Sequence, residues 1–240
     1  MQGTANRIMV LVTILLCIYL SWYYMLYRMT MNMEPVATWS SYDIALLFLI
    51  WAIMMAGMML PSAIPVILLV EKISQKRKQH NSNYTSPIFF SLGYILAWAS
   101  YSLLITLLQW WFHHLTLLTP MMDSANATFS YSILILAGIY QFTPFKQRCL
   151  QLCRSPLAVI NSHFKEGKLS AIYLGLHHGT YCVGCCLMLM AILFVSGVMN
   201  LTWILILTIM VMIEKALPQG EVLSKALGVM LILLGLSYAL

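Results

Sequence analysis

The residues with the clearest capacity for chemistry lie in the segment HHGTYCVGCCLMLM, positions 177 to 190. Within a long apolar run, this segment holds two histidines, three cysteines and two methionines. Thiolate and imidazole ligands favour Zn(II), Cu(I) or an iron–sulfur cluster, and an added thioether shifts the preference toward Cu(I). The segment therefore offers the ligand types of a soft-metal site.

The spacing of these residues suits a single face of a helix, because residues three, four and seven apart lie on one side. His178, Cys182 and Cys185 follow that spacing, and Cys186 continues it. One face then presents an imidazole and up to three thiols within ~12 Å, at 1.5 Å per residue. One helix rarely closes a tetrahedral site, so we expect a neighbouring element to complete it. The candidate ligands in this segment are His177, His178, Cys182, Cys185 and Cys186.

A packing role for the same segment is the alternative. Free cysteine is commonly buried as a small inert side chain. Gly175 and Gly179 form a GxxxG step for close helix packing, and Cys182 continues it as another small residue. Packing does not explain the two adjacent histidines, since polar groups at membrane depth are costly and usually functional. We therefore favour a metal or redox role.

A second pair of cysteines lies in YQFTPFKQRCLQLCRSP, residues 140 to 156. Cys149 and Cys153 are four residues apart and so share a helical face; Pro144 suits the start of that helix and Pro156 its end. Nearby cations favour thiolates, and a reducing cytosol favours metal binding over a disulfide. Two chance cysteines on an interfacial helix remain the alternative. We treat both as candidate metal ligands, at the other end of a path from the first segment.

Methionines surround a proline in WAIMMAGMMLPSAIP, residues 51 to 65. Pro61 has no N–H, so the Gly57 carbonyl loses its helical partner, and such a break is tolerated in membranes only under cover of protein or water. Met58 and Met59 directly precede this break and either pack there or line a path for a soft ion. The four methionines of the turn are Met54, Met55, Met58 and Met59.

Two further groups are weaker candidates. The segment WWFHHLTLLTPMMD, residues 110 to 123, either captures a metal ion on the outer side or forms an aromatic belt, and we favour the belt. Its polar and sulfur-bearing members are His113, His114, Met121, Met122 and Asp123. Glu214 is expected to pair locally with Lys215 or to reach toward the interface.

The composition places these segments in a membrane. Of 240 residues, 61% are hydrophobic and 8% charged, with a mean hydropathy of +0.85, whereas soluble domains carry about 25% charged residues. The net charge of +6 is explained by basic cytoplasmic loops and does not indicate nucleic acid.

We predict an all-α polytopic bundle, one domain over residues 1–240, with about seven spans. The expected spans are 8–27, 44–70, 88–112, 128–142, 171–195, 201–217 and 222–240. With the N-terminus in the cytoplasm and the C-terminus outside, twelve Lys and Arg residues fall inside and only Arg28 outside. Residues 143–168 then form a cytoplasmic segment with a short cysteine-bearing helix.

The quoted cysteine and methionine segments, with GYILAW and EKALPQG, resemble a prokaryotic family described as predicted metal-binding integral membrane proteins. The resemblance covers most of the chain beyond residue 45. One departure is Leu187, where the family tends to carry an aromatic residue after the paired cysteines. The resemblance implies metal binding and names no substrate.

Three functions fit these observations. We favour binding of a soft transition metal, copper before zinc, in transport, delivery or assembly of a metalloenzyme, with a metal chaperone or metalloenzyme as partner. A membrane thiol–disulfide oxidoreductase and a structural subunit with packing cysteines are the alternatives. No nucleotide-binding Gly-rich loop or hydrolase-type carboxylate pair is evident, so enzyme activity is the less favoured class. The expected location is the cell inner membrane.

Overall fold

The computed structural model describes residues 2–29, 39–79, 86–116, 118, 126–155, 167–198 and 200–239. These residues form a helical protein, and within them there is no β-sheet. Met121, Met122 and Asp123 lie outside the described residues. The all-α fold class predicted from the sequence is confirmed for the described part.

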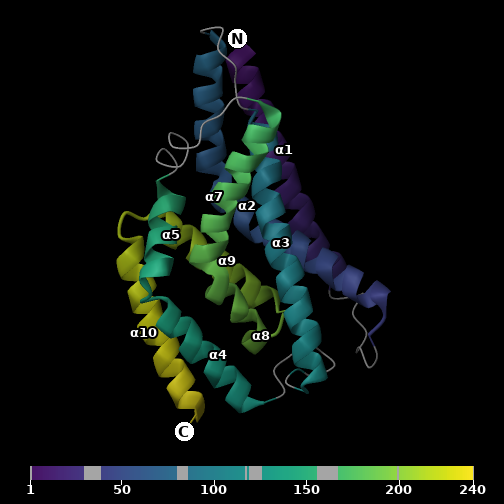
Figure 1. The fold of residues 1–240 in the computed structure, drawn as a ribbon, viewed down its shortest axis with the longest axis vertical. Coiled ribbons are helices and arrows are strands. Elements are labelled where there is room, and N and C mark those ends of the chain that lie inside the picture. Colours follow the sequence, from purple (N-terminus) through teal and green to yellow (C-terminus); the bar gives the residue numbers. More distant parts are fainter. Residues whose placement is uncertain are drawn as a thin grey trace.

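The helices follow one another along the chain with short connections. They are α1 (Gln2–Tyr24), which continues into the π-helical turn η1 (Met25–Met29), α2 (Ser41–Gln79), α3 (Pro87–His114), α4 (Ala127–Tyr140), α5 (Pro144–Arg154), α7 (Lys168–Ala191), α8 (Leu193–Ser196), α9 (Leu201–Ala216) and α10 (Gly220–Ala239). In Figure 1, α1, α2, α3 and α7 make a long bundle, and α4 and α10 lie together beside it. Between these two groups lie α5 and α9.

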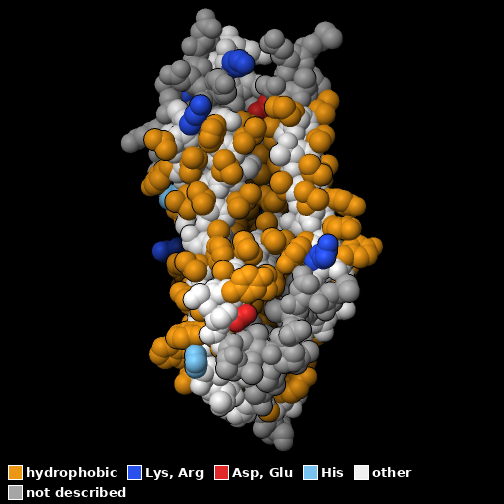
Figure 2. Space-filling model, turned by 90° about the vertical axis from the view of Figure 1, so that its right-hand side faces the viewer, with side chains coloured by type: hydrophobic (Ala, Val, Ile, Leu, Met, Phe, Trp, Pro, Cys, Tyr) orange, Lys and Arg blue, Asp and Glu red, His pale blue; other side chains and the backbone are white. Residues whose placement is uncertain are grey.

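Five of these helical segments are long and apolar enough to cross a membrane, judged by length and composition. They are Arg7–Arg28, Ser41–Gln79, Pro87–His114, Lys168–Ser196 and Gly220–Tyr238. Two further expected spans correspond to shorter helices, α4 and α9. Hydrophobic side chains dominate the face shown in Figure 2. Many leucines and isoleucines of the described residues are exposed.

Helix α2 continues through both of its prolines over 39 residues. The carbonyl of Gly57, which Pro61 deprives of its helical donor, accepts a hydrogen bond from Trp22 Nε1 of α1 at 3.3 Å. A Cβ at Gly57 would lie 3.0 Å from Met25 Cε and 3.0 Å from Ser21 Cβ, so α1 reaches this carbonyl because residue 57 has no side chain. Protein thus covers the freed group, as expected.

Glycines bring α3 and α7 into close contact. A Cβ at Gly175 would lie 1.9 Å from the Phe90 carbonyl oxygen, and one at Gly179 would lie 2.5 Å from Ala97 Cβ. A Cβ at Gly93 of α3 would lie 2.0 Å from the Ile172 carbonyl oxygen. The GxxxG step predicted from the sequence is therefore a helix crossing, and it places the cysteine-bearing turns of α7 directly against α3.

The cysteine-bearing helix α5 begins where the sequence predicts. Thr143 caps it by accepting from the Lys146 N–H at 3.3 Å, and Pro144 occupies its first turn, where a missing N–H costs nothing. Helix α5 packs on α7 and also contacts α9. This position brings its cysteines toward those of α7.

Candidate metal centre

Four thiols from two helices meet in the interior. The Cys185 thiol donates to the Cys182 carbonyl oxygen at 3.1 Å, and the Cys185 and Cys186 sulfurs are 3.4 Å apart. Cys153 of α5 is close enough to interact electrostatically with Cys182 and Cys185, and all of these thiols are free. We call Cys153, Cys182, Cys185 and Cys186 the thiol cluster. Its members are at most 7% exposed, so the cluster is closed to bulk solvent.

Cys149 lies one helical turn before Cys153 and packs against α7 beside the cluster. A Cβ at Gly184 would be 2.8 Å from the Cys149 sulfur, so the missing side chain at residue 184 makes the space for this thiol. Tyr140 donates to the Gly184 carbonyl oxygen at 2.5 Å and so contacts the same turn of α7. Both cysteines of α5 are therefore buried against the turn that carries Cys182 and Cys185.

The two thiols of α5 are held in their protonated form when no metal is bound. Burial raises the pKa of the Cys149 thiol above its usual value. The interaction with Cys182 and burial raise the pKa of the Cys153 thiol well above its usual value, and the interaction with Cys185 offsets this rise only in part. Because metals bind the thiolate, binding at either residue must release a proton.

A charged group and a hydroxyl contact the cluster at Cys182. Lys215 of α9 donates from Nζ to the Cys182 sulfur at 2.7 Å and to Ser62 Oγ at 3.2 Å. The Tyr94 hydroxyl is 3.0 Å from the same sulfur and donates to the Met59 carbonyl oxygen at 3.3 Å. Side chains of α3 and α9 thus contact one sulfur of α7, and α2 holds those two side chains through Met59 and Ser62. The ammonium group complements the thiolate that a metal would require.

Lys215 and Tyr94 are the site residues that the sequence analysis missed. The sequence assigns Lys215 only to the basic residues that set orientation, and Tyr94 appears only within the GYILAW segment that resembles the family. The only sequence signal for Lys215 is its position at the end of an apolar helix, where a cation is a candidate functional group.

The two adjacent histidines have different surroundings, since consecutive residues point about 100° apart on a helix. His178 is 2% exposed, its ring lies near the rings of Phe90 and Tyr94, and its Nδ1 has no hydrogen-bond partner in the described part of the chain. His177 instead lies among tyrosines: its Nε2 is 3.3 Å from the Tyr181 hydroxyl. Of the two, His178 shares a neighbour, Tyr94, with the thiol cluster.

Met58 and Met59 are fully buried, as are Met54 and Met55. The backbone of this turn reaches the cluster through Met59, whose carbonyl oxygen accepts from Tyr94 and from Ser62 Oγ at 2.8 Å. The methionine turn of α2 therefore lies next to the thiol cluster through a shared set of hydrogen bonds.

His113 and His114, at the end of α3, contact aromatic rings. His113 Nδ1 accepts from Trp39 Nε1 at 2.9 Å, and the His114 ring is 4.7 Å from that of Trp110. These contacts are those of an aromatic layer at the end of α3.

Glu214 pairs with Lys146 of α5 and not with its neighbour Lys215. Glu214 Oε1 is 2.7 Å from Lys146 Nζ, with both side chains at most 3% exposed. Lys146 also donates to Gln141 Oε1, which accepts from Ser224 Oγ at 3.1 Å. The local pair expected from the sequence is wrong, because neighbouring residues of α9 face different helices: Glu214 faces α5, and Lys215 faces α7.

The described residues contain no group of three or more His, Cys, Asp and Glu side chains already arranged to hold a metal ion. The donor types nevertheless fit a soft ion, with four thiols and an unpartnered imidazole nitrogen nearby. Sulfurs bound at about 2.3 Å to one tetrahedral metal are roughly 3.8 Å apart, so the 3.4 Å between Cys185 and Cys186 requires only a small opening.

These features define a helical protein with apolar, membrane-length helices around a buried set of thiols. The chain belongs to the PpoB2 family, described as a copper chaperone, whose profile matches residues 48–238. The matched region includes α3, α5, α7, α9 and every cysteine of the thiol cluster. The resemblance to a metal-binding family is thereby confirmed, and a copper-related function is supported. Comparisons with curated proteins and with solved structures found no match.

Proposed function

We propose that this protein binds Cu(I) at the thiol cluster and delivers it to a copper-dependent partner as a membrane-bound chaperone. The observation that carries the proposal is the convergence of Cys153 with Cys182, Cys185 and Cys186, two segments separated along the chain, in a family described as copper chaperones. Zinc is the alternative ion, since it also binds thiolates. The soft donors and the neighbouring methionine turn favour copper.

The ligands come from both helices. Cys182, Cys185 and Cys186 supply the α7 side, and Cys153 supplies the α5 side. Cys149, buried one turn away against Gly184, is the next thiol along α5 and offers a second position for the ion. His178 provides a nitrogen donor close to Cys182. Transfer between such similar ligands needs no water-filled pore, because each thiol exchanges for the next.

The proposed setting is the inner membrane, with seven spans, a cytoplasmic N-terminus and an external C-terminus. The basic residues near α5 then place Cys149 and Cys153 at the cytoplasmic side. Met58 and Met59 add thioether ligands on α2 next to the thiol cluster. His113 lies at the C-terminal end of α3, away from the part of α3 that contacts the cluster. A metal chaperone or a metalloenzyme would exchange copper at the α5 side, because Cys149 and Cys153 are slightly more exposed than the three thiols of α7.

Burial of the thiols argues against the thiol–disulfide oxidoreductase. Exchange with a protein disulfide requires access for a second sulfur in line with the attacked bond. The cluster thiols are at most 7% exposed, whereas a Cu(I) ion can be passed between buried side chains by ligand exchange.

The test is the metal content of the purified full-length protein, measured by mass spectrometry after anaerobic loading with Cu(I) or Zn(II). We expect stoichiometric copper in the wild type and its loss in the triple variant Cys182→Ala, Cys185→Ala, Cys186→Ala. Cys17→Ala is the matched control, because Cys17 is an exposed cysteine of α1. Equal copper in the triple variant, or a folded wild type that takes up no copper, would overturn the proposal.

A further inference from the structure

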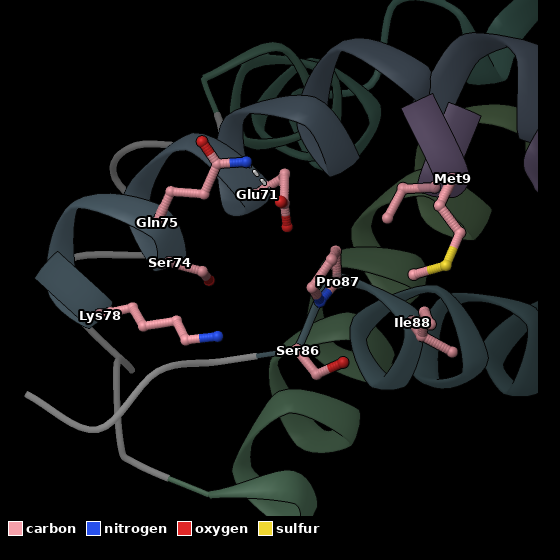
Figure 3. A pocket seen from close by; sticks show the side chains of 9 residues that line it. Met9, Glu71, Ser74, Gln75, Lys78, Ser86, Pro87 and Ile88 are labelled. Atoms are coloured by element: carbon pink, nitrogen blue, oxygen red, sulfur yellow. Dashed lines mark hydrogen bonds between the residues drawn. The ribbon is translucent and has the colours of Figure 1, made fainter. Parts of the chain in front are cut away.

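A cavity lined by both polar and apolar side chains lies at the end of the bundle where α1 begins, α2 ends and α3 begins, on segments that the thiol cluster does not use. Its volume is about 190 Å³, close to that of six water molecules at about 30 Å³ each. Figure 3 shows Glu71, Ser74 and Lys78 of α2 on one side and Ser86 with Pro87 on the other. Residues 71, 74 and 78 share one helical face, so α2 presents a carboxylate, a hydroxyl and an ammonium in a row.

The Glu71 carboxylate needs a partner that the described chain supplies only in part. Glu71 is 4% exposed, and its Oε1 accepts from Gln75 Nε2 at 2.6 Å. That amide is its only partner among the described residues, and the carboxylate points into the cavity (Figure 3). A buried carboxylate is costly unless it is paired and hydrogen-bonded, so this end of the cavity favours a cation with N–H donors.

The other end of the cavity has the opposite character. Lys78 lies two helical turns beyond Glu71, and its side chain extends toward Ser86 (Figure 3). Ser86 is the N-cap residue of α3, yet its hydroxyl makes no capping hydrogen bond. The positive end of the 28-residue helix α3, a serine hydroxyl and an ammonium group therefore meet here, which favours a phosphate, although Pro87 itself has no N–H to offer.

An apolar groove continues from this cavity along the helices. Val10 and Ile88 line both the cavity and the groove, which runs between α1 and α3 past Ile14, Leu92 and Ile95. The groove has a volume of about 120 Å³ and its lining is almost wholly apolar. A ligand that fills both spaces has a charged head at the helix ends and a hydrocarbon tail beside the helices.

We infer that this cavity and groove bind one phospholipid with a primary-amine headgroup. The phosphate lies at Lys78, Ser86 and the start of α3, the ammonium group donates to Glu71, and one acyl chain occupies the groove past Ile14 and Ile95. A choline headgroup fits less well, because its quaternary nitrogen has no N–H to donate to the carboxylate. The site joins the first three helices and does not depend on the copper proposal.

The test uses the full-length protein in phosphatidylcholine vesicles that contain a small fraction of phosphatidylethanolamine with a photoactivatable acyl chain. We expect crosslinks to concentrate on the groove segments of α1 and α3, and unlabelled phosphatidylethanolamine to displace them better than phosphatidylcholine. Glu71→Gln and Lys78→Met should each weaken capture roughly tenfold, as expected for loss of one charged hydrogen bond. Lys76→Met is the matched control, because Lys76 lies at the same helix end but does not line the cavity.

Two further experiments, a groove variant and a competition with a soluble headgroup compound, test whether the acyl chain and the headgroup both contribute to binding. Thr13→Phe fills the groove without touching the headgroup residues and should also reduce capture, with an unchanged unfolding midpoint in detergent as proof of folding. Soluble glycerophosphoethanolamine should not displace the lipid. The proposal would be overturned if the soluble compound displaced the lipid or if phosphatidylcholine competed equally well. It would also be overturned if α10 were crosslinked as strongly as α1 and α3, or if Lys76→Met lost as much capture as the cavity variants.

Discussion

Lys215 of α9 donates a hydrogen bond to the Cys182 sulfur at 2.7 Å, and the residue just before it, Glu214, contacts Lys146 of α5 at 2.7 Å. Two consecutive residues thus tie the end of α9 to both cysteine-bearing helices. One contact places charge at the thiol cluster, and the other holds α5 in place. These two roles can be separated by substitution.

Replacing Lys215 by Met should weaken Cu(I) binding. A Cu(I) ion bound by two or more thiolates carries net negative charge, and the buried site then lacks the ammonium that offsets it. Loss of a charged hydrogen bond corresponds to about 1.5–3 kcal/mol, or roughly 10- to 100-fold in affinity. Competition against a Cu(I) chelator measures the change, with Lys225→Met, an exposed residue of α10, as the control. Unchanged or stronger binding in Lys215→Met would contradict this role.

Breaking the Glu214–Lys146 pair should loosen α5 and expose Cys153. Removing one partner of a buried ion pair typically costs about 3–5 kcal/mol, because the other charge is left buried without compensation. We expect Glu214→Gln and Lys146→Met each to lower the unfolding midpoint and to speed labelling of Cys153 by a maleimide.

The double variant is the critical comparison for this pair. Glu214→Gln with Lys146→Met removes both charges and should recover part of the lost stability, which a double-mutant cycle measures as coupling. Additive losses would show that the two side chains act independently.

The sequence predicts which side of α7 is buried, but it does not predict how α5 packs against that side. Helical spacing places His178, Cys182 and Cys185 together, and the structure has them on the buried side of α7. That Cys153 completes the cluster depends on how α5 packs, which involves the absence of a side chain at Gly184 and the Lys146 contact. Such contacts join residues far apart in sequence, and no local pattern encodes them.

The error at Glu214 has the same origin. Sequence proximity suggested Lys215 as its partner, yet adjacent side chains on a helix diverge by about 100°. Each of the two residues therefore meets a different neighbouring helix. The helical class and the membrane-length apolar segments were predictable because they depend on composition and local periodicity. The number of spans, their orientation and the metal-binding roles stay predictions.

Substituting Gly184 by Ala should push α5 away from α7. The new Cβ would lie 2.8 Å from the Cys149 sulfur, a distance at which the Cys149 side chain or the helix that carries it must shift. Overpacking of this kind costs about 1–3 kcal/mol, and we expect a matching loss of stability with weaker copper loading. Removing the clashing sulfur in the double variant Gly184→Ala, Cys149→Ala should restore much of the stability. A double variant no more stable than Gly184→Ala would show that the clash lies elsewhere.

Trp22 should matter because of the proline at position 61. Its indole Nε1 donates to the Gly57 carbonyl at 3.3 Å, the group that Pro61 leaves without a helical donor. Trp22→Phe keeps an aromatic ring but removes the donor, so we expect a loss of about 1–3 kcal/mol in unfolding free energy, as for a buried carbonyl without a partner. In a Pro61→Ala background the helix supplies its own N–H to Gly57, and the same Trp22→Phe change should then cost clearly less. Denaturant unfolding of the four proteins in one detergent measures the difference. An equal cost in both backgrounds would mean that Trp22 acts through packing against α2 rather than through its hydrogen bond.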